Sequence, residues 1–259
     1  MKHTSKFETA VVNPIRAHFG RSKDLRKMEF DGSLSIRSDI KSKYGYSGDL
    51  ADLFCGNQGL PVHKWHHYIP YYDRYFSRFR GSQVRFLEIG VFRGGSLQMW
   101  REYFGQNAII YGIDNDPNCA DLNGLAGQVR IGSQDDPEFL KEVINEMGGV
   151  DVVLDDGSHK TKHQMKSLKL LFPAMSQGGV YMVEDLHTSF WRGYSGGYGR
   201  RLNFFEFAAD IINDMHHWWH FNRIKHPSLK NMCSGLHFHD SIAVFERGSA
   251  FEPTHSLVP

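Results

Sequence analysis

Between residues 84 and 185 the chain alternates short apolar runs, each followed by a glycine or an acidic residue, with helical patterns. Five runs have the length and composition of buried strands: residues 84–89, 108–113, 129–131, 150–154 and 180–183. Strands that alternate with helices fold into a parallel, doubly wound sheet with right-handed crossovers. The pattern therefore predicts an α/β protein with a Rossmann-like sheet.

The helices of this fold are expected at residues 96–104, 137–147, 164–176 and 203–219. Asp136 provides an N-cap for the second helix, and Gly178 with Gly179 provides a stop for the third. Two further strands surround His239 and Asp240, and their short link makes them an antiparallel hairpin. We therefore expect a seven-stranded, mostly parallel sheet with an antiparallel C-terminal hairpin.

The first 55 residues lack a sustained hydrophobic period, and we interpret them as an N-terminal arm or cap before a main domain at residues 56–259. Residues 11–19 can hold a short helix. Residues 71–79 place aromatic rings at helical spacing, which is typical of a packed core. The cluster before them, residues 63–68, combines rings with hydrogen-bond donors and suits the wall of a pocket.

The composition disfavours several classes of protein. A formal net charge of +1 over 259 residues gives no general attraction to nucleic acid or to membranes. No apolar run approaches the roughly 18–20 residues that cross a bilayer, and the N-terminus lacks the apolar core of a secretory signal. The three cysteines are far apart, so we expect no disulfide framework and assign the chain to the reducing cytoplasm.

Residues 84–96 have the pattern of a strand, a tight turn and a helix N-terminus, the junction where open α/β sheets bind ligands. A dinucleotide fingerprint requires a glycine where this chain has Phe92, so NAD and FAD are disfavoured. No GxxxxGK[ST] motif is present either. The junction therefore points to a ligand without phosphates.

A carboxylate inside this motif, Glu88, favours a cationic ligand, and S-adenosylmethionine carries both a sulfonium and an ammonium group. Asp114 ends the second strand and is placed to accept the ribose hydroxyls, while the residues after the third strand can meet the adenine edge. The side chains and turn residues expected to contact this donor are Glu88, Gly90, Gly95, Ser96, Asp114, Ser133 and Gln134.

A second constellation is acidic. Asp155 and Asp156 follow the fourth strand, and Glu184 and Asp185 follow the fifth. Four carboxylates at one sheet edge would repel one another unless a cation lay between them. All-oxygen ligands favour a hard ion, with Mg²⁺ ahead of Ca²⁺ or Mn²⁺. Asp156, Glu184 and Asp185 can supply three oxygen ligands. The alternative is that both doublets merely cap helices on exposed loops.

His159 lies three residues after Asp156, and we predict that these two residues act in catalysis. A neutral imidazole suits removal of a hydroxyl proton, and a metal would lower the pKa of that hydroxyl and orient it. His163 and His187 are the next candidates. No pair of histidines has zincin spacing, so zinc is disfavoured. Residues 188–201 form either a lid that excludes water or an ordinary surface loop.

Several segments resemble the macrolide-sugar O-methyltransferases of the macrocin and mycinamicin type, over residues 63–248. The resemblance is carried by LEIGVFRGGSLQMW (87–100), IYGIDND (110–116), VVLDDGSH (152–159) and VEDLHTSFW (183–191). DDGSH together with VED is its most specific part. GSQD (132–135) is also similar to the adenine-side motif of catechol O-methyltransferase.

This resemblance implies a class I methyltransferase fold, Mg²⁺ dependence and transfer of a methyl group to a sugar hydroxyl. By matching motif it implies metal ligation by Asp156, Glu184 and Asp185, His159 as the base, and Asp155 nearer the donor. It also implies donor-side contacts from residues 65–68, Tyr68 among them. It leaves homo-oligomerisation open.

We therefore predict an S-adenosylmethionine-dependent, Mg²⁺-assisted O-methyltransferase acting on a hydroxyl of a sugar or a glycosylated small molecule. One alternative keeps the fold and the metal but uses another reaction, as in the hydroxylase role once proposed for cephalosporin-pathway proteins. The other is a non-catalytic scaffold whose carboxylates bind a structural ion.

Overall fold

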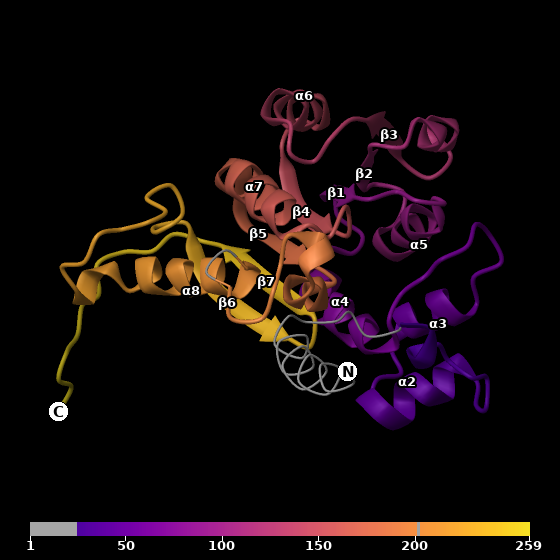
Figure 1. Cartoon of the computed structure of the whole chain (residues 1–259), viewed down its shortest axis with the longest axis horizontal. Helices are drawn as coiled ribbons and strands as arrows, with labels where there is room; N and C mark the ends of the chain where they lie inside the picture. Colours follow the sequence, from indigo (N-terminus) through magenta and orange to yellow (C-terminus); the bar gives the residue numbers. More distant parts are fainter. Residues whose placement is uncertain (1–24, 201–202) are drawn as a thin grey trace, which may run out of the picture.

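The computed structural model describes residues 25–200 and 203–259, and in this part of the chain seven strands form one sheet (Figure 1). The strands are β1 (Arg85–Ile89), β2 (Ile109–Asp114), β3 (Gln128–Ile131), β4 (Val150–Asp155), β5 (Met175–Val183), β6 (Cys233–His239) and β7 (Ile242–Arg247). Their spatial order is β3-β2-β1-β4-β5-β7-β6. Strands β1 to β5 run parallel, and β7 is antiparallel to both β5 and β6. The predicted fold class is confirmed.

Helices cover both faces of the sheet (Figure 1). One face carries α2 (Ile36–Tyr44), α3 (Asp49–Cys55), α4 (Ile69–Phe76) and α5 (Gly95–Phe104). The other carries α6 (Pro137–Met147), α7 (Thr161–Leu171) and α8 (Phe204–Met215). Successive strand residues point to opposite faces, so Phe86 is buried in the first core and Leu87 in the second. The strand ends are thereby fixed from both sides.

The described part of the N-terminal region is more ordered than the sequence predicted. Ile40, Leu50 and Ala51 are fully buried in the same core cluster as Phe86. The short apolar stretches of α2 and α3 acquire this burial only through contact with other elements, so they leave no periodic signal. The helix expected at residues 11–19 lies outside the described residues. The boundary between residues 55 and 56 stays a prediction.

The prediction for the third helix was wrong at its end. Helix α7 stops at Leu171, a single 3₁₀ turn covers Phe172–Ala174, and β5 begins at Met175. Pro173 explains the early stop, because proline removes a backbone donor and clashes with the preceding helical turn. Gly178 and Gly179 consequently lie inside β5 instead of ending a helix.

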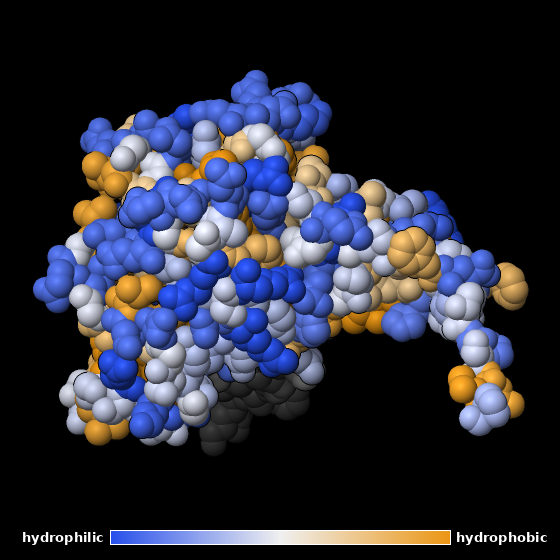
Figure 2. Space-filling model, turned by 180° about the vertical axis from the view of Figure 1, so that it is seen from behind, coloured by the Kyte–Doolittle hydropathy of each residue, from blue (hydrophilic) through white to orange (hydrophobic). Residues whose placement is uncertain are grey.

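Hydropathy describes both the helices and one face of the molecular surface. Among the helices of the described residues, none combines the length and hydropathy needed to span a membrane. The face turned away from the view of Figure 1 is mostly hydrophilic, and the C-terminal tail extends from the body (Figure 2). This tail exposes Phe251, Leu257 and Val258.

Candidate active site at the carboxyl edge of the sheet

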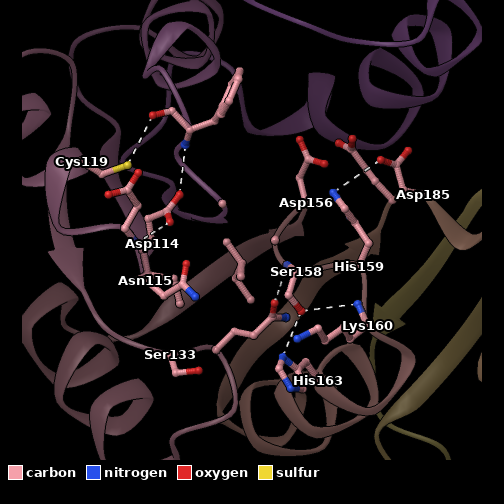
Figure 3. A pocket seen from close by; sticks show the side chains of 18 of the residues that line it. Asp114, Asn115, Cys119, Ser133, Asp156, Ser158, His159, Lys160, His163 and Asp185 are labelled. Carbon is pink, nitrogen blue, oxygen red and sulfur yellow. Dashed lines mark hydrogen bonds and ion pairs between the residues drawn. The ribbon is translucent and has the colours of Figure 1, made fainter. Parts of the chain in front are cut away.

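A cavity of about 360 Å³ opens at the carboxyl ends of the parallel strands (Figure 3). The predicted site residues that line it are Gly90, Asp114, Ser133, Gln134, Asp156, His159, Glu184 and Asp185. Of the segment 63–68 that was expected in its wall, residues 63–65 line the cavity, whereas Tyr68 does not line it and is fully buried. In Figure 3, Asp114 and Ser133 border one side of the cavity, and Asp156 and Asp185 border the other. Residues predicted to contact the donor and residues predicted to bind the metal therefore line one cavity.

The turn after β1 is fixed by close packing and by Asp114. Gly90 has φ of 97°, and a Cβ there would lie 2.2 Å from the carbonyl oxygen of Asp156. Asp114 Oδ2 accepts the backbone N–H groups of Val91 (2.9 Å) and Phe92 (3.0 Å), while Oδ1 accepts that of Asp116 (2.9 Å). Burial opposes ionisation of Asp114, but these N–H groups outweigh it and lower its pKa. A carboxylate accepts up to about four hydrogen bonds, so capacity remains for a ligand hydroxyl.

Glu88 and Ser96 lie behind the cavity wall. Ser96 Oγ donates to Glu88 Oε2 at 2.7 Å, and Trp100 Nε1 donates to Glu88 Oε1 at 3.2 Å. Glu88 is fully buried, and this burial raises its pKa to about 7. These contacts stabilise the base of the turn, so any influence of Glu88 on a cationic ligand acts across the wall.

Gly95 is required for packing. A Cβ there would lie 2.4 Å from the carbonyl oxygen of Leu60 and 2.3 Å from that of Pro61. The segment that carries these carbonyls continues into residues 63–65 of the cavity wall. Gly95 therefore allows the N-terminal segment to lie directly on the start of α5.

Asp155 does not line the cavity, and its carboxylate points toward α7. It is fully buried and accepts hydrogen bonds from Ser167 Oγ (2.7 Å), Gln134 Nε2 (3.0 Å) and Tyr181 OH (3.0 Å). Gln134 in turn accepts the backbone N–H of Ser158 at 2.8 Å. The predicted role of Asp155 beside the donor stays a prediction, and this geometry suits a residue that positions Gln134 and the turn after β4.

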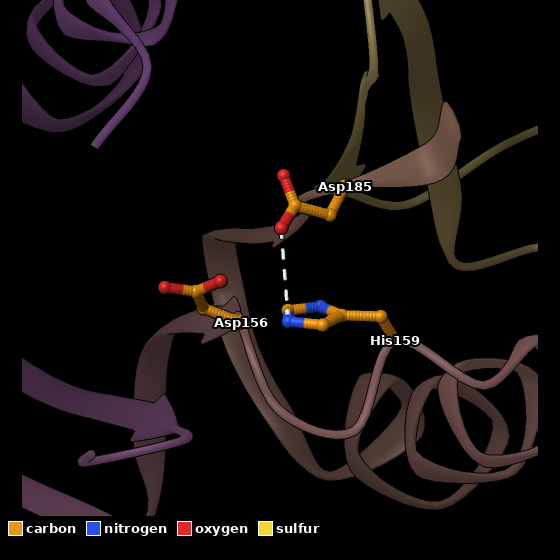
Figure 4. Close-up of side chains that lie close together, drawn as sticks. All are labelled: Asp156, His159 and Asp185. Atoms are coloured by element: carbon orange, nitrogen blue, oxygen red, sulfur yellow. Dashed lines mark ion pairs between the residues drawn. The ribbon is translucent and has the colours of Figure 1, made fainter. Parts of the chain in front are cut away.

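Asp156, His159 and Asp185 converge (Figure 4): one ligand atom from each lies within 4.8 Å of the others. His159 Nε2 is 3.6 Å from Asp185 Oδ2, and its Nδ1 is buried without a hydrogen-bond partner among the described residues. His159 (φ 54°) and Asp185 (φ 56°) both adopt the left-handed conformation, a strain typical of functional sites. Thr188 Oγ1 holds this turn by donating to the carbonyl of His159 at 2.9 Å. The two carboxylates can hold a divalent cation, with the imidazole directly beside it.

Lys64 is the functional residue that the sequence interpretation missed. Its Nζ lies 2.5 Å from Asp156 Oδ2, 3.1 and 3.2 Å from the oxygens of Glu184, and 3.9 Å from Glu88 Oε1. Its side chain is 2% exposed. Burial opposes the charged form, but the surrounding carboxylates outweigh it and raise the pKa of Lys64. The cation expected among the carboxylates is therefore supplied in part by the protein itself.

Glu184 lies on the buried side of this ammonium group. Its Oε1 also accepts the hydroxyl of Tyr72 at 2.5 Å, and burial together with Asp156 raises its pKa. It is not among the three residues whose ligand atoms converge. Asp185, by contrast, is oriented by Tyr68, whose hydroxyl donates to Oδ1 at 2.8 Å. Of the three predicted metal ligands, the structure brings Asp156 and Asp185 together.

The other candidate histidines make hydrogen bonds to serines. His163 Nδ1 is 3.0 Å from Ser158 Oγ, and His187 Nδ1 is 2.6 Å from Ser241 Oγ. The ring of His187 packs edge-on against Trp65 and Trp191, at centroid distances of 5.9 and 4.9 Å. An aromatic wall thus borders the acidic residues on the side of residues 186–194.

Residues 87–186 match the family model of a methyltransferase domain. Among solved structures, the chain is similar to the MycE methyltransferase of the mycinamycin biosynthetic pathway, in complex with Mg, SAH and mycinamycin VI. The TM-score is 0.70 at 28% sequence identity, over 88% of this chain and 62% of that one. The seven-stranded sheet thus has the class I methyltransferase fold.

The homologues of the chain are sugar O-methyltransferases, which confirms the predicted resemblance. It is 35% identical to 8-demethyl-8-(2-methoxy-α-L-rhamnosyl)-tetracenomycin-C 3'-O-methyltransferase of Streptomyces olivaceus, over 83% of this chain and 58% of the relative. It is 35% identical to mycinamicin VI 2''-O-methyltransferase of Micromonospora griseorubida, over 71% and 48%. With demethylmacrocin O-methyltransferase of Streptomyces fradiae it shares 40% identity over 51% and 36%. The chain thus spans between about a third and three fifths of the length of these relatives.

Proposed function

We propose that this protein transfers the methyl group of S-adenosylmethionine to a hydroxyl of a sugar or glycosylated small molecule, assisted by a divalent cation, with Mg²⁺ as the first choice. The observation that carries the proposal is the single cavity in which Asp114 faces the converging group of Asp156, His159 and Asp185. A donor bound near Asp114 and an acceptor bound near His159 would meet inside that cavity.

The donor would lie along the ends of β1, β2 and β3. Asp114 keeps acceptor capacity for a ribose hydroxyl, and the left-handed Gly90 brings the backbone close to the ligand. Ser133 and Gln134 would border the adenine. Glu88 is fully buried behind the wall and would support the turn that holds the donor through its bonds to Ser96 and Trp100.

The acceptor would lie against the acidic group. His159 Nε2 would remove the proton of the acceptor hydroxyl while the oxygen attacks the methyl carbon, and the carbon–sulfur bond breaks to leave a neutral thioether. Asp185, 3.6 Å from Nε2, would stabilise the resulting imidazolium. A divalent cation bound by Asp156 and Asp185 would lower the pKa of the hydroxyl and hold its oxygen in line. Glu184 is held by Lys64, so we assign the ion to Asp156 and Asp185.

The substrate class rests on the relatives and on the wall of the site. The names of the three relatives specify O-methyltransferases, one of them acting on a rhamnosyl-tetracenomycin, and the MycE complex contains mycinamycin VI. The ring of Trp65 lines the cavity and offers an apolar face on which a pyranose can pack.

The experiment is a mass-spectrometric assay of purified protein with deuteromethyl-labelled S-adenosylmethionine and a panel of glycosylated metabolites. We expect one glycoside class to gain a single labelled methyl group, with loss of the signal in EDTA and recovery in Mg²⁺. Turnover unaffected by EDTA would remove the metal from the proposal. A product that gains oxygen in place of a methyl group would contradict the reaction type.

A further inference from the structure

We propose that Lys64 is a built-in counter-ion that competes with the divalent cation for the acidic site. The inference rests on the metal site of the proposed function. Its starting observation is a buried ammonium group among three carboxylates, with Nζ at 2.5 Å from Asp156, 3.1 Å from Glu184 and 3.9 Å from Glu88.

The ammonium group of Lys64 offsets part of the negative charge of the buried carboxylates, but it does not fill the whole acidic site. Glu88 and Glu184 are buried, and a buried carboxylate without a cation is strongly destabilising. One positive charge lies among three carboxyl groups, and Asp185 adds a fourth at the same strand end. Asp156 and Asp185 line the cavity, so their carboxylates stay open to a further cation while Lys64 is in place.

Asp156 couples the two positions. One of its oxygens binds Lys64, yet the residue also contributes a ligand atom to the group with His159 and Asp185. Its side chain is 23% exposed, whereas those of Lys64 and Glu184 are each 2% exposed. A metal ion would therefore approach from the cavity side and draw on the carboxylate that Lys64 already holds. Thermodynamic linkage requires each cation to weaken the other.

The position of Lys64 is set from outside the sheet. It follows the segment whose Leu60 and Pro61 carbonyls lie on Gly95, and Leu60 N–H donates to Gln98 Oε1 at 3.1 Å. This anchoring limits how far Lys64 can withdraw. We therefore expect Lys64 to stay in the site when a metal binds and to lower the metal affinity by its charge.

The test measures Mn²⁺ binding by calorimetry and by electron paramagnetic resonance on wild type and Lys64→Met. We expect the Mn²⁺ dissociation constant to fall at least about tenfold in the variant, because a competing charge is removed. We also expect the metal-free variant to unfold at a lower temperature and to gain more stability from Mn²⁺. The matched control is Lys166→Met, an exposed lysine whose Nζ lies 3.8 Å from Asp135, and it should match wild type.

Two further variants cover the case in which Lys64→Met does not fold. Lys64→Gln keeps a donor for the carboxylates and should also bind Mn²⁺ more tightly. The double variant Lys64→Met/Glu184→Gln removes one charge of each sign, so it should recover stability and return Mn²⁺ affinity toward the wild-type value.

The outcomes separate this inference from the proposed function. Equal or weaker Mn²⁺ binding by both Lys64 variants, with normal binding by wild type, would overturn the counter-ion role alone. Binding by the Lys64 variants but not by wild type would support the counter-ion role and contradict metal assistance. Absence of binding in all of these proteins would overturn both.

Discussion

At the scale of single residues, the site depends on a few side chains held in strained or buried positions. His159 is the sharpest case, because a left-handed backbone aims its ring at Asp185 and Asp156. The sequence predicted these three residues from the spacing of DDGSH and VED. It did not reveal Lys64, because a lone lysine in an aromatic segment has no distinguishing pattern. The only available signal was the unbalanced charge of the four carboxylates.

Replacing His159 with Ala should lower kcat by about 10²–10⁴-fold, the usual contribution of a general base. Donor and metal binding measured by calorimetry should persist. The control is His216→Ala, an exposed histidine just after α8. If metal affinity fell together with kcat, His159 would be a ligand and not the base.

Replacing Asp114 with Asn should weaken S-adenosylhomocysteine binding by about 1.5–3 kcal/mol, the range for a hydrogen bond to a charged group. The carboxylate both accepts the N–H groups of Val91 and Phe92 and faces the cavity. Titration calorimetry measures the change, and Asp121→Asn on the exposed surface is the control. Unchanged affinity would place the donor elsewhere.

At the scale of elements, the sequence predicted the strands well and the surrounding helices less well. Strand ends were marked by Gly90, Asp114 and the acidic doublets, which interrupt apolar runs. The end of α7 was misplaced because the break at Pro173 was overlooked. The role of Gly95 could not be predicted, since the Leu60 and Pro61 carbonyls that touch it come from a distant segment.

Gly95→Ala should destabilise the protein by about 1–3 kcal/mol, the range for overpacking, because its Cβ would meet two backbone carbonyls. Displacement of that segment moves residues 63–65 of the cavity wall, so donor affinity should fall too. Denaturant unfolding and donor titration measure the two effects. Gly193→Ala, where a Cβ meets nothing within 4 Å, should leave both unchanged. A fully stable Gly95→Ala with normal donor binding would refute this packing role.

Asp151 links the starts of β1 and β4. It accepts hydrogen bonds from the backbone N–H (2.9 Å) and the side chain of Arg85. Burial raises the pKa of Asp151, but these hydrogen bonds outweigh burial, so the pKa is lowered. A lowered folded pKa contributes stability above the unfolded pKa of about 3.9 and loses it as pH falls through the folded value. Asp151→Asn should therefore cost about 1–3 kcal/mol at neutral pH.

That difference between wild type and Asp151→Asn should narrow below about pH 4, where the unfolded carboxyl is protonated. Urea unfolding of both proteins across this range is the measurement. Asp121→Asn, on the exposed surface, should show no such pH dependence. A difference that is constant with pH would mean that the lost contact is not the ion pair.

At the scale of the whole molecule, two halves of one sheet edge meet in one cavity. In the proposed function, strands β1 to β3 carry the donor side, and β4 and β5 carry the metal and acceptor side. The strand order places β1 beside β4, so the two halves are adjacent. Parallel pairing explains why a sequence pattern spread over about a hundred residues predicted one cavity.

The measurement that tests this claim most directly is paramagnetic relaxation of bound S-adenosylmethionine labelled with ¹³C at its methyl group. With Mn²⁺ bound to the acidic residues, we predict strong paramagnetic relaxation of the methyl signal. In Asp156→Asn, this relaxation should disappear while the donor still binds. If donor and Mn²⁺ bind together and the methyl signal is unaffected, the two ligands do not share the cavity and the account is contradicted.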